Sequence, residues 1–424
     1  MKKKVTAVIL AAGKSKRTKT SVPKVLLDLG GRPFIFHIIS TLLSVKYIDD
    51  IIVVLGHKKE LIRNQIRHEF KNVKFAFQSK QNGTAKAVEA SNNLLKGKDN
   101  VFVICADTPL ITTATLNNFI KFFFKDRLDC AIITALFEKR SDLGKVIRDT
   151  EGNIEAIKEK VDIRGSSKEE VNSGIYCFRK KMLFDNLRKI KLNKRGKEFF
   201  LTDIINIFYR RGAKMKGFVV SDNVEILGVN DQKNLSLARK IVNAGFIERL
   251  MEKGIMFIDP DTTFVSFDTK IGSDSVVYPF TFIEKNVIIG SNCSIGPFAH
   301  IRSGSVIEDY TKVGNFTEVN RSRLKKNVRM KHFSYLGDTT VGEDSNIGAG
   351  VVVANYDGKR KHKTVIHKRA FIGSDTVIVA PSVIGEGAAT GAGSVVTKPV
   401  APKTVVIGVP ARVFKRKKEV RDNG

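Results

Sequence analysis

A six-residue period of apolar side chains runs through the second half of the sequence and limits its possible folds more than any other feature. A glycine or another small or polar residue often follows the apolar one, as in IGSDSV and VGEDSN. The apolar positions are Ile271, Val277, Ile283, Ile289, Ile295, Ile301, Ile307, Val313 and Val319, then, after two shortened steps, Met330, Leu336, Val341, Ile347 and Val353, and later Ile366, Ile372, Ile378, Ile384, Thr390 and Val396. So many units at one spacing predict a solenoid, in which three units form a coil and each apolar residue points inward.

Hexapeptide sequences of this kind resemble left-handed parallel β-helices. The resemblance implies a homotrimer with acyl-transfer sites between its subunits. Residues 354–365 interrupt the period, and we expect this segment to project from the coils as a loop.

Residues 1–229 instead alternate short apolar strands with helical patterns. Such alternation predicts a Rossmann-like α/β domain, with a mostly parallel sheet covered by helices on both faces. Ligands of such sheets bind beyond the carboxyl ends of the strands. Strands are expected at 5–10, 51–55, 73–77, 101–105 and 131–136, and helices include 34–44, 58–70 and 84–95.

Residues 231–253 have the apolar spacing of one amphipathic helix. This helix either connects two domains or is the last helix of the first one. We divide the chain into an α/β domain at 1–229, a linker helix at 230–253, and a β-helix domain at 254–424 that ends in a short basic tail.

The composition limits the class of protein. The 424 residues, 42% of them hydrophobic, are enough for two folded domains. No apolar run approaches the ~20 residues of a membrane span, and we expect no signal peptide because a short strand follows Met1. The four cysteines lie far apart with no CxxC pair. This argues against structural zinc and fits a reducing, cytoplasmic setting.

The net charge of +30 has two explanations. One is binding to nucleic acid or to an anionic membrane surface. The other is a lysine-rich solvated surface together with phosphorylated substrates. We favour the second and expect no specific nucleic-acid partner, because the sequence carries no signature of a nucleic-acid-binding fold. The role of the basic stretch at 412–421 stays open.

The strand at 5–10 runs directly into a small basic loop that closes on Pro23-Lys24. A backbone without bulky side chains can surround phosphates with its N–H groups, and Arg17 and Lys24 add positive charge for a triphosphate. The residues that begin this loop are Leu10, Ala11, Ala12 and Gly13. The run predicts a chain that uses a nucleotide to activate a phosphorylated molecule.

A carboxylate stands at the same expected sheet edge. Asp107 comes shortly after the buried strand at 101–105. Mg²⁺ prefers a few carboxylates together with phosphate oxygens. Asp107 is therefore a candidate magnesium ligand beside the loop.

These motifs resemble the signature of sugar-1-phosphate nucleotidyltransferases, in which such a loop holds the nucleoside triphosphate. Ser15 and Lys16 stand where that family usually has Gly-Thr, whereas Arg17 and Lys24 are retained. The resemblance implies that Gln78, Gly83 and Thr84 contact the base, that Gly144, Glu159 and Asn172 bind the sugar, and that Asn230 is the second Mg²⁺ ligand beside Asp107. A sugar phosphate is already ionised near neutral pH, so catalysis needs alignment and charge neutralisation rather than a base.

The second half resembles the acetyltransferase half of the bifunctional family that makes UDP-N-acetylglucosamine. In that family a histidine removes a proton from the sugar amine as the amine attacks acetyl-CoA, a task that suits an imidazole. By this resemblance His332 is the base, Arg302, Asn320, Tyr335, Asn355 and Tyr356 bind the sugar phosphate, and Asn346, Ala349, Ser374 and Ala392 line the acetyl-CoA groove.

Two positions depart from that pattern. Asn320 stands where the family usually has a lysine that contacts the phosphate. Arg321 could compensate, although neighbouring strand residues face opposite sides. Gly408 stands where the family has an arginine that clamps the coenzyme.

The leading hypothesis is a bifunctional enzyme that acetylates glucosamine-1-phosphate and then couples the product to UTP. The alternative is a monofunctional sugar-1-phosphate nucleotidyltransferase whose β-helix is a trimerisation scaffold. A non-catalytic assembly protein is disfavoured, because it has no use for Lys24, Asp107, Asn230 and His332. A different nucleotide or amino-sugar specificity stays open.

Overall fold

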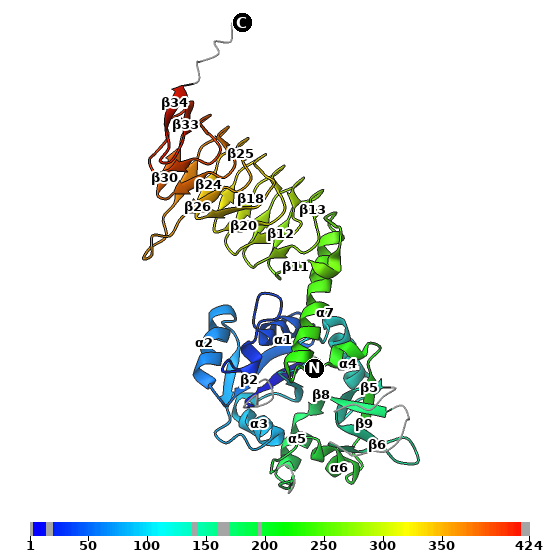
Figure 1. Cartoon of the computed structure of the whole chain (residues 1–424). Coiled ribbons are helices and arrows are strands. Elements are labelled where there is room, and N and C mark those ends of the chain that lie inside the picture. Colours follow the sequence, from blue (N-terminus) through cyan, green and yellow to red (C-terminus); the bar gives the residue numbers. More distant parts are fainter. Residues whose placement is uncertain (1–2, 14–19, 138–142, 160–168, 194–196, 417–424) are drawn as a thin grey trace. The chain divides into compact units, whose positions relative to one another are not determined.

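The computed structural model describes residues 3–13, 20–137, 143–159, 169–193 and 197–416. The chain divides into two compact units, Met1–Ala238 and Arg239–Gly424. The two are described separately below (Figure 1).

The first unit is built on a mixed sheet with the strand order β3-β2-β1-β4-β8-β5-β9. β1 lies at its centre and pairs in parallel with β2 and β4, and β2 pairs in parallel with β3. The strands are β1 (Val5–Ala11), β2 (Ile48–Leu55), β3 (Lys74–Phe77), β4 (Asn100–Cys105), β5 (Cys130–Phe137), β8 (Glu169–Arg179) and β9 (Met215–Val219). The five strands predicted from the sequence are confirmed, with ends that differ by up to three residues.

Within this strand order, β8 runs against its neighbours. β8 pairs antiparallel with both β4 and β5, whereas β5 and β9 are parallel to each other. β8 also meets a short hairpin formed by β6 (Lys145–Arg148) and β7 (Ile154–Lys158). The sequence analysis did not predict β8 or the hairpin. Of the candidate sugar-binding residues, Asn172 lies on β8, and Gly144 and Glu159 flank the hairpin.

Helices cover both faces of the sheet. Successive side chains of β4, which point to opposite faces, pack against different helices. Val101 and Val103 belong to the core cluster beneath α3, α5 and α6. Phe102 points to the other face, where its ring lies 6.3 Å from that of Phe119 on α4. The helices of this unit are α1 (Phe34–Leu43), α2 (Lys59–Glu69), α3 (Thr84–Ala90), α4 (Thr113–Lys125), α5 (Lys180–Leu187) and α6 (Asp203–Tyr209).

The expected helix at 231–253 is present as α7 (Gln232–Met251). The boundary between the two units falls within it. Its C-terminal half is fixed to the first coil of the second unit by Asn243. The amide of this side chain donates to the carbonyl oxygen of Thr263 (2.7 Å) and accepts from the N–H of Val265 (2.9 Å).

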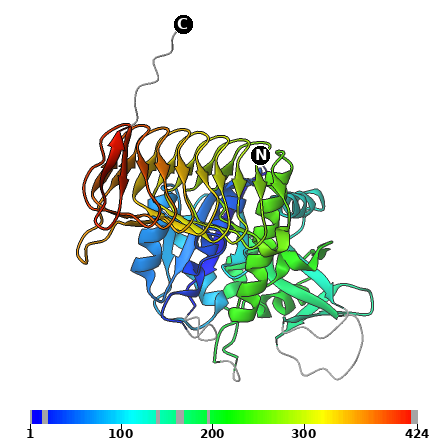
Figure 2. The same ribbon diagram turned by 45° about the horizontal axis from the view of Figure 1, so that its top comes forward.

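The second unit is a parallel β-helix with three sheets, drawn coil by coil in Figure 2. Each strand pairs with the strand one coil later, for example Val277 with Ile295 and Ile283 with Ile301. Every apolar position of the six-residue period is buried, which confirms that these side chains point inward. The first sheet holds β10 (Met256–Phe257), β13 (Val276–Val277), β16 (Ser294–Ile295), β19 (Lys312–Val313), β22 (Arg329–Met330), β25 (Asn346–Ile347), β28 (Phe371–Ile372), β31 (Ala389–Thr390), β33 (Thr404–Ile407) and β34 (Arg412–Arg416).

The other two sheets complete the coils. The second holds β11 (Phe264–Val265), β14 (Phe282–Ile283), β17 (His300–Ile301), β20 (Thr317–Asn320), β23 (Ser334–Gly337), β26 (Val352–Ala354), β29 (Val377–Val379) and β32 (Val395–Val396). The third holds β12 (Lys270–Ile271), β15 (Ile288–Ile289), β18 (Val306–Ile307), β21 (Arg323–Leu324), β24 (Thr339–Val341), β27 (Thr364–Ile366) and β30 (Ser382–Ile384).

Irregularities in the period fall at the corners between sheets. Ile289 pairs with Ile307, whereas Ile307 pairs with Leu324, so the chain is one residue shorter in the second of these coils. The expected loop lies between β26 and β27 and extends away from the coils (Figure 2). It folds back through a bridge between Tyr356 and Lys361.

Close approach of successive coils requires glycine at certain corners. A Cβ atom added to Gly314 would lie 1.9 Å from the carbonyl oxygen of Lys331 on the next coil. Real atoms do not approach so closely, so the coils could accept a side chain there only by separating.

We therefore expect Gly314→Ala to destabilise the β-helix. By the usual cost of overpacking, the apparent midpoint of thermal unfolding should fall by about 2–10 °C. Gly245→Ala on α7 is the matched control, because a Cβ atom there meets nothing within 4 Å. Differential scanning calorimetry of both variants measures this, and equal midpoints for Gly314→Ala and the wild type would contradict the packing argument.

Candidate active sites

A pocket of 440 Å³ opens in the first unit where β1 and β4 end. Parallel pairing of Leu10 with Cys105 brings these two strand ends together. The predicted residues that line it are Leu10, Ala11, Ala12, Gly13, Lys24, Gln78, Gly83, Thr84 and Asp107. It is also lined by Val25, Gln81, Ala87, Cys105, Ala106 and Glu198, which the sequence analysis did not single out. Arg17, Ser15 and Lys16 lie outside the described residues.

Three of the predicted charged and polar groups meet at this sheet edge. The Lys24 ammonium donates to a carboxylate oxygen of Asp107 (3.1 Å) and to the side-chain oxygen of Asn230 (2.9 Å). The N–H of Val229 also donates to the backbone oxygen of Asp107 (2.7 Å), which fixes the Asn230 loop beside β4. Two oxygens from distant parts of the chain thus converge on one cation.

The donor set at this point fits a magnesium ion. A carboxylate oxygen and an amide oxygen are ligands of the kind Mg²⁺ takes, with phosphate oxygens and water completing the shell. Across the described ranges, no group of three or more His, Cys, Asp or Glu side chains could hold a metal ion by itself. A metal bound by Asp107 and Asn230 would therefore depend on ligands from a phosphate or water.

Two of the candidate base-binding residues, Gly83 and Thr84, contact the segment around Phe199. Gln78 is buried and donates to the backbone oxygen of Gly83 (3.1 Å). Gly83 has φ +126°, and a Cβ atom there would lie 2.3 Å from the carbonyl oxygen of Phe199. The hydroxyl of Thr84 accepts from the N–H of Leu201 (2.9 Å). Only glycine allows this approach of the two segments.

The candidate sugar-binding residues also gather. The N–H of Asn172 donates to the backbone oxygen of Gly144 (2.8 Å), and a Cβ atom at Gly144 would lie 3.6 Å from the Glu159 carboxyl carbon. The Asn172 amide donates to the Tyr176 hydroxyl (2.7 Å), and the Thr202 hydroxyl donates to Glu159 (3.1 Å). Sequence reasoning did not assign a role to Tyr176, although it ends the run VNSGIY that contains Asn172, and it missed Thr202, which belongs to no recognisable motif.

Cys105 connects the pocket to this sugar-side group. Its sulfur would lie 3.4 Å from a Cβ atom at Gly174 on β8. Burial raises the pKa of the Cys105 thiol to about 12, and the negative charge of Asp107 adds to the increase. The thiol is therefore neutral at physiological pH and is a packing group rather than a nucleophile.

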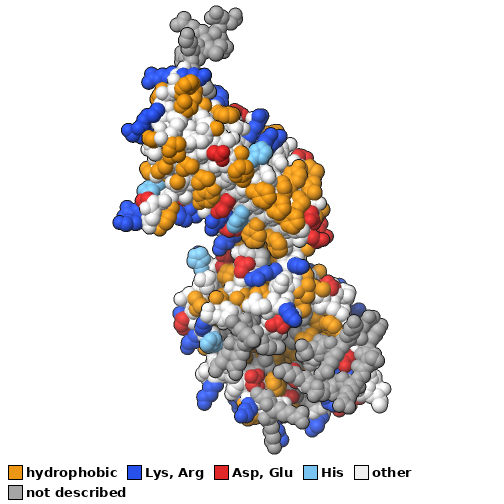
Figure 3. All heavy atoms as spheres, in the orientation of Figure 1, with side chains coloured by type: hydrophobic (Ala, Val, Ile, Leu, Met, Phe, Trp, Pro, Cys, Tyr) orange, Lys and Arg blue, Asp and Glu red, His pale blue; other side chains and the backbone are white. Residues whose placement is uncertain are grey.

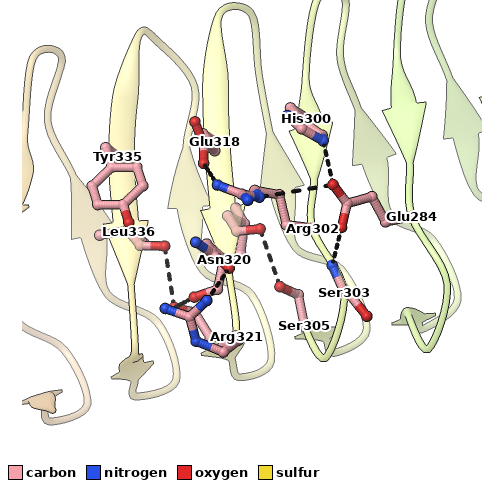
Figure 4. A network of polar contacts seen from close by, with 12 residues as sticks. Glu284, His300, Arg302, Ser303, Ser305, Glu318, Asn320, Arg321, Tyr335 and Leu336 are labelled. Atoms are coloured by element: carbon pink, nitrogen blue, oxygen red, sulfur yellow. Dashed lines mark hydrogen bonds and ion pairs between the residues drawn. The ribbon is translucent and has the colours of Figure 1, made fainter. Parts of the chain in front are cut away.

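In the second unit, predicted residues lie along one side of the β-helix, and Figure 4 shows three of them, Arg302, Asn320 and Tyr335, on or just after β17, β20 and β23. Asn355 follows β26 on the next coil. Register pairs His300 with Glu318, Glu318 with Tyr335, and Asn320 with Gly337 on successive coils. The predicted residues carried there are Arg302, Asn320, Tyr335 and Asn355. The Tyr335 hydroxyl donates to the Asn355 side-chain oxygen at 3.5 Å.

Arg302 is held between carboxylates that sequence reasoning missed. It donates to Glu318 at 2.8 Å and lies 3.8 Å from Glu284, which also contacts His300 (Figure 4). The hydrogen bond with Glu318 raises the pKa of the Arg302 guanidinium further above its usual value. Glu318 carries no motif in the sequence, and only its pairing with His300 on the previous coil places it beside Arg302.

Glycine also creates space at this edge. A Cβ atom at Gly337 would lie 2.5 Å from the Tyr335 hydroxyl and 2.6 Å from the Asn355 amide nitrogen. These two polar groups therefore occupy the volume that any other residue would fill. Within the described residues, His332 and Tyr356 lie outside this network. His332 is exposed just before β23, and Tyr356 is exposed in the projecting loop.

The residues predicted to line an acetyl-CoA groove form a column. Ala349, Ser374 and Ala392 occupy the same turn position after β25, β28 and β31, and Gly408 continues the column after β33. Backbone hydrogen bonds join Asp375 to Ala349 (2.7 Å) and Gly393 to Ser374 (2.8 Å). Asn346 belongs to the first strand of the same series.

Comparison with known proteins finds two family models, which match different parts of the chain. Residues 6–226 match the nucleotidyl transferase family model. Residues 268–301, 286–321 and 363–398 match the model of bacterial transferase hexapeptides. The fold predicted from the sequence, an α/β nucleotidyltransferase domain followed by a left-handed parallel β-helix, is confirmed.

Curated relatives match over nearly the whole length. The bifunctional protein GlmU of Clostridium acetobutylicum is 35% identical over 96% of this chain and 97% of its own length. That of Caldicellulosiruptor saccharolyticus is 35% identical over 100% of both chains. This chain belongs to the bifunctional GlmU family. The GlmU of Heliobacterium modesticaldum is similar as well, 36% identical over 94% of each chain.

Membership of the GlmU family confirms the resemblance on which the sequence analysis relied. It favours the bifunctional enzyme over a nucleotidyltransferase with an inert β-helix, because GlmU relatives match through both halves. Among the described residues, no helix is both long and apolar enough to cross a membrane.

Proposed function

We propose that this enzyme transfers an acetyl group from acetyl-CoA to glucosamine-1-phosphate and then a uridylyl group from UTP to the product. The result is UDP-N-acetylglucosamine, a precursor of cell-wall and surface polysaccharides. The observation that carries the proposal is the convergence of Asp107 and Asn230 on the Lys24 ammonium at the edge of the sheet.

In the uridylyl step, a phosphate oxygen of N-acetylglucosamine-1-phosphate attacks the α-phosphorus of UTP in line, and pyrophosphate leaves. The small residues Ala11, Ala12 and Gly13 leave room for the triphosphate against the backbone, and Lys24 neutralises its charge. Asp107 and Asn230 would hold Mg²⁺, which when bound offsets the negative charge that builds up on the phosphates. Gln78, Gly83 and Thr84 would orient the base, and the group around Asn172 would orient the sugar.

In the acetyl step, the amine of glucosamine-1-phosphate attacks the acetyl carbonyl carbon. A C–N bond forms, the C–S bond breaks, and the coenzyme leaves as a thiolate that then takes up a proton to become the thiol. His332 would accept the proton from the amine, and Arg302 would bind the phosphate. Ala349, Ser374 and Ala392 place small side chains at the same turn of successive coils, which would leave room for the extended coenzyme.

A homotrimer is part of the proposal. Phe280, Phe298 and Phe316 stack at one corner of successive coils, with ring centroids 4.9 Å apart. These rings are about half exposed, and all three residues have left-handed φ angles of 53–56°. Bulky residues rarely adopt this conformation. Figure 3 shows hydrophobic side chains exposed on one face of the second unit, and exposed apolar patches mark interaction sites.

We also propose that the enzyme works in the cytoplasm. All four cysteines are free, and three of them are buried. Their free thiols suit a reducing compartment.

A coupled assay tests the two activities. The purified chain should release thiol from acetyl-CoA only when glucosamine-1-phosphate is present, and should then release pyrophosphate when UTP and Mg²⁺ are added. Pyrophosphate from N-acetylglucosamine-1-phosphate without any thiol release would make the β-helix a scaffold. Replacing UTP by thymidine triphosphate in the same assay tests nucleotide specificity.

Lys24→Ala should lower uridylyl transfer by about 100-fold or more, because it removes a preorganised charge from the triphosphate site. Acetyl transfer should be unchanged. The comparison is made on one preparation by measuring pyrophosphate and thiol separately. If both reactions continue at wild-type rates, the assignment of the nucleotide site is incorrect.

His332→Ala should have the opposite effect. Loss of a general base lowers rates by about 10²–10⁴-fold, so thiol release should fall by that factor while pyrophosphate release stays constant. Acetylation by this variant at the wild-type rate would exclude His332 as the base.

Phe298→Arg should dissociate the trimer, because it places a charge within the stacked column. Light scattering after size exclusion should give the mass of three chains for the wild type and a smaller mass for the variant. A variant that keeps the wild-type mass would indicate that the column lies outside the interface.

A further inference from the structure

The corner that follows Asn320 changes the direction of the next side chain. Neighbouring residues of a strand normally face opposite sides. Arg321, however, has φ +47° and ends the strand in a left-handed turn. Its guanidinium returns to the side of Asn320 and donates to the amide oxygen of that residue (2.9 Å) (Figure 4).

Arg321 is fixed in this position from the next coil. Its Nε and one Nη donate to the two carboxylate oxygens of Asp338, at 2.7 and 2.8 Å. The amide of Asn355 donates to the same carboxylate (2.5 Å), and its oxygen accepts from the Tyr335 hydroxyl (3.5 Å). One continuous series of contacts therefore links Arg321 to two predicted ligands of the sugar phosphate.

The surroundings contain several negative charges. Glu284 and Glu318 contact Arg302, and Asp338 contacts Arg321. A phosphate dianion that approached Arg302 alone would meet these carboxylates with too little positive charge to balance them. Arg321 brings a second cation to this edge, on the coil between that of Arg302 and that of Tyr335.

Tyr335 is connected to both arginines through their partners: it pairs in register with Glu318, which binds Arg302, and it contacts Asn355, which binds the Asp338 carboxylate that holds Arg321. The pKa of Arg302 and that of Arg321 are raised first by their carboxylate hydrogen bonds, and the Tyr335 phenol adds to the increase in each case. The Arg321 side chain is 39% exposed. Its contacts with Asp338 and Asn320 use three of its N–H groups, and the others can donate to a phosphate.

We propose that Arg321 binds the phosphate of glucosamine-1-phosphate, as the second cation of a site that it forms with Arg302 around Tyr335. This inference rests on the acetyltransferase activity proposed above. It makes Arg321 a substrate-binding residue, with Asp338 as the residue that positions it. Asn320 is then a neutral neighbour that orients the guanidinium and does not need to carry charge.

The test compares steady-state acetylation by Arg321→Ala with that by the wild type, in the full-length chain. A charge-assisted hydrogen bond to phosphate is strong, so the KM for glucosamine-1-phosphate should rise by about 10- to 100-fold. The KM for acetyl-CoA should stay within about twofold, because Arg321 does not lie in the coenzyme column. Arg323→Ala is the matched control: Arg323 lies on the same coil and pairs with Glu308, but it belongs to a different sheet.

A second variant separates binding from a structural role. In Asn320→Lys/Arg321→Ala the positive charge is moved by one residue, and the KM for glucosamine-1-phosphate should recover to within about tenfold of the wild type. A purely structural effect of losing the Asp338 contact would not be repaired by a lysine at 320. An unchanged KM in Arg321→Ala, or no recovery in the double variant, would overturn the inference.

Binding of glucosamine-1-phosphate without acetyl-CoA, measured by calorimetry, separates the role of Arg321 from the proposed acetyltransferase activity. If the wild type binds the sugar phosphate and Arg321→Ala binds it equally well, Arg321 is not a ligand although the proposed activity stands. If the wild type neither binds glucosamine-1-phosphate nor releases thiol, the acetyltransferase assignment itself fails and the inference falls with it.

Discussion

Parallel pairing of strands is the constraint on which both candidate sites depend. In a parallel sheet, all strands of one direction end at the same edge, so residues far apart in sequence meet there. In the first unit this pairing brings the loop after β1 beside Asp107 after β4. In the second unit it repeats at every coil, so that one turn position becomes a column of residues down the β-helix. The position of each site therefore depends on the register of strand pairing as much as on the identity of its side chains.

Much of the fold could be predicted because burial imposes a simple period. The inward positions of a coil must be apolar, and their spacing is visible in the sequence without any further information. The central strands of the first unit were equally clear, since both faces are buried. β8 was missed because its sequence, EEVNSGIYCFR, is interrupted by polar residues and a glycine, so no continuous apolar run marks it as a strand. Its antiparallel direction becomes visible only in its pairing with β4 and β5.

The candidate sites were predictable to different degrees. Residues on one loop or at one strand end, such as Gly13 and Asp107, could be placed at the sheet edge from local order alone. The contacts that hold these residues in place could not be predicted from the sequence. Glu318 and Asp338 carry no motif of their own, and they matter because the coils bring them beside Arg302 and Arg321. The conformation of Arg321 was equally hidden, since the strand rule predicts the wrong side for its guanidinium and only the left-handed turn reverses it.

The corners of the β-helix, unlike its core, tolerate changes in the number of residues. One corner omits a residue after Asn320, and another accommodates the whole segment that contains Tyr356, yet Val353 still pairs with Ile378 on the following coil. Insertions and deletions at corners thus leave the stacking of the inward residues unaltered. A lineage that keeps this solenoid can exchange the chemistry on its surface by editing corners, one at a time, while its scaffold stays the same. The architecture separates the evolution of ligand recognition from the evolution of stability.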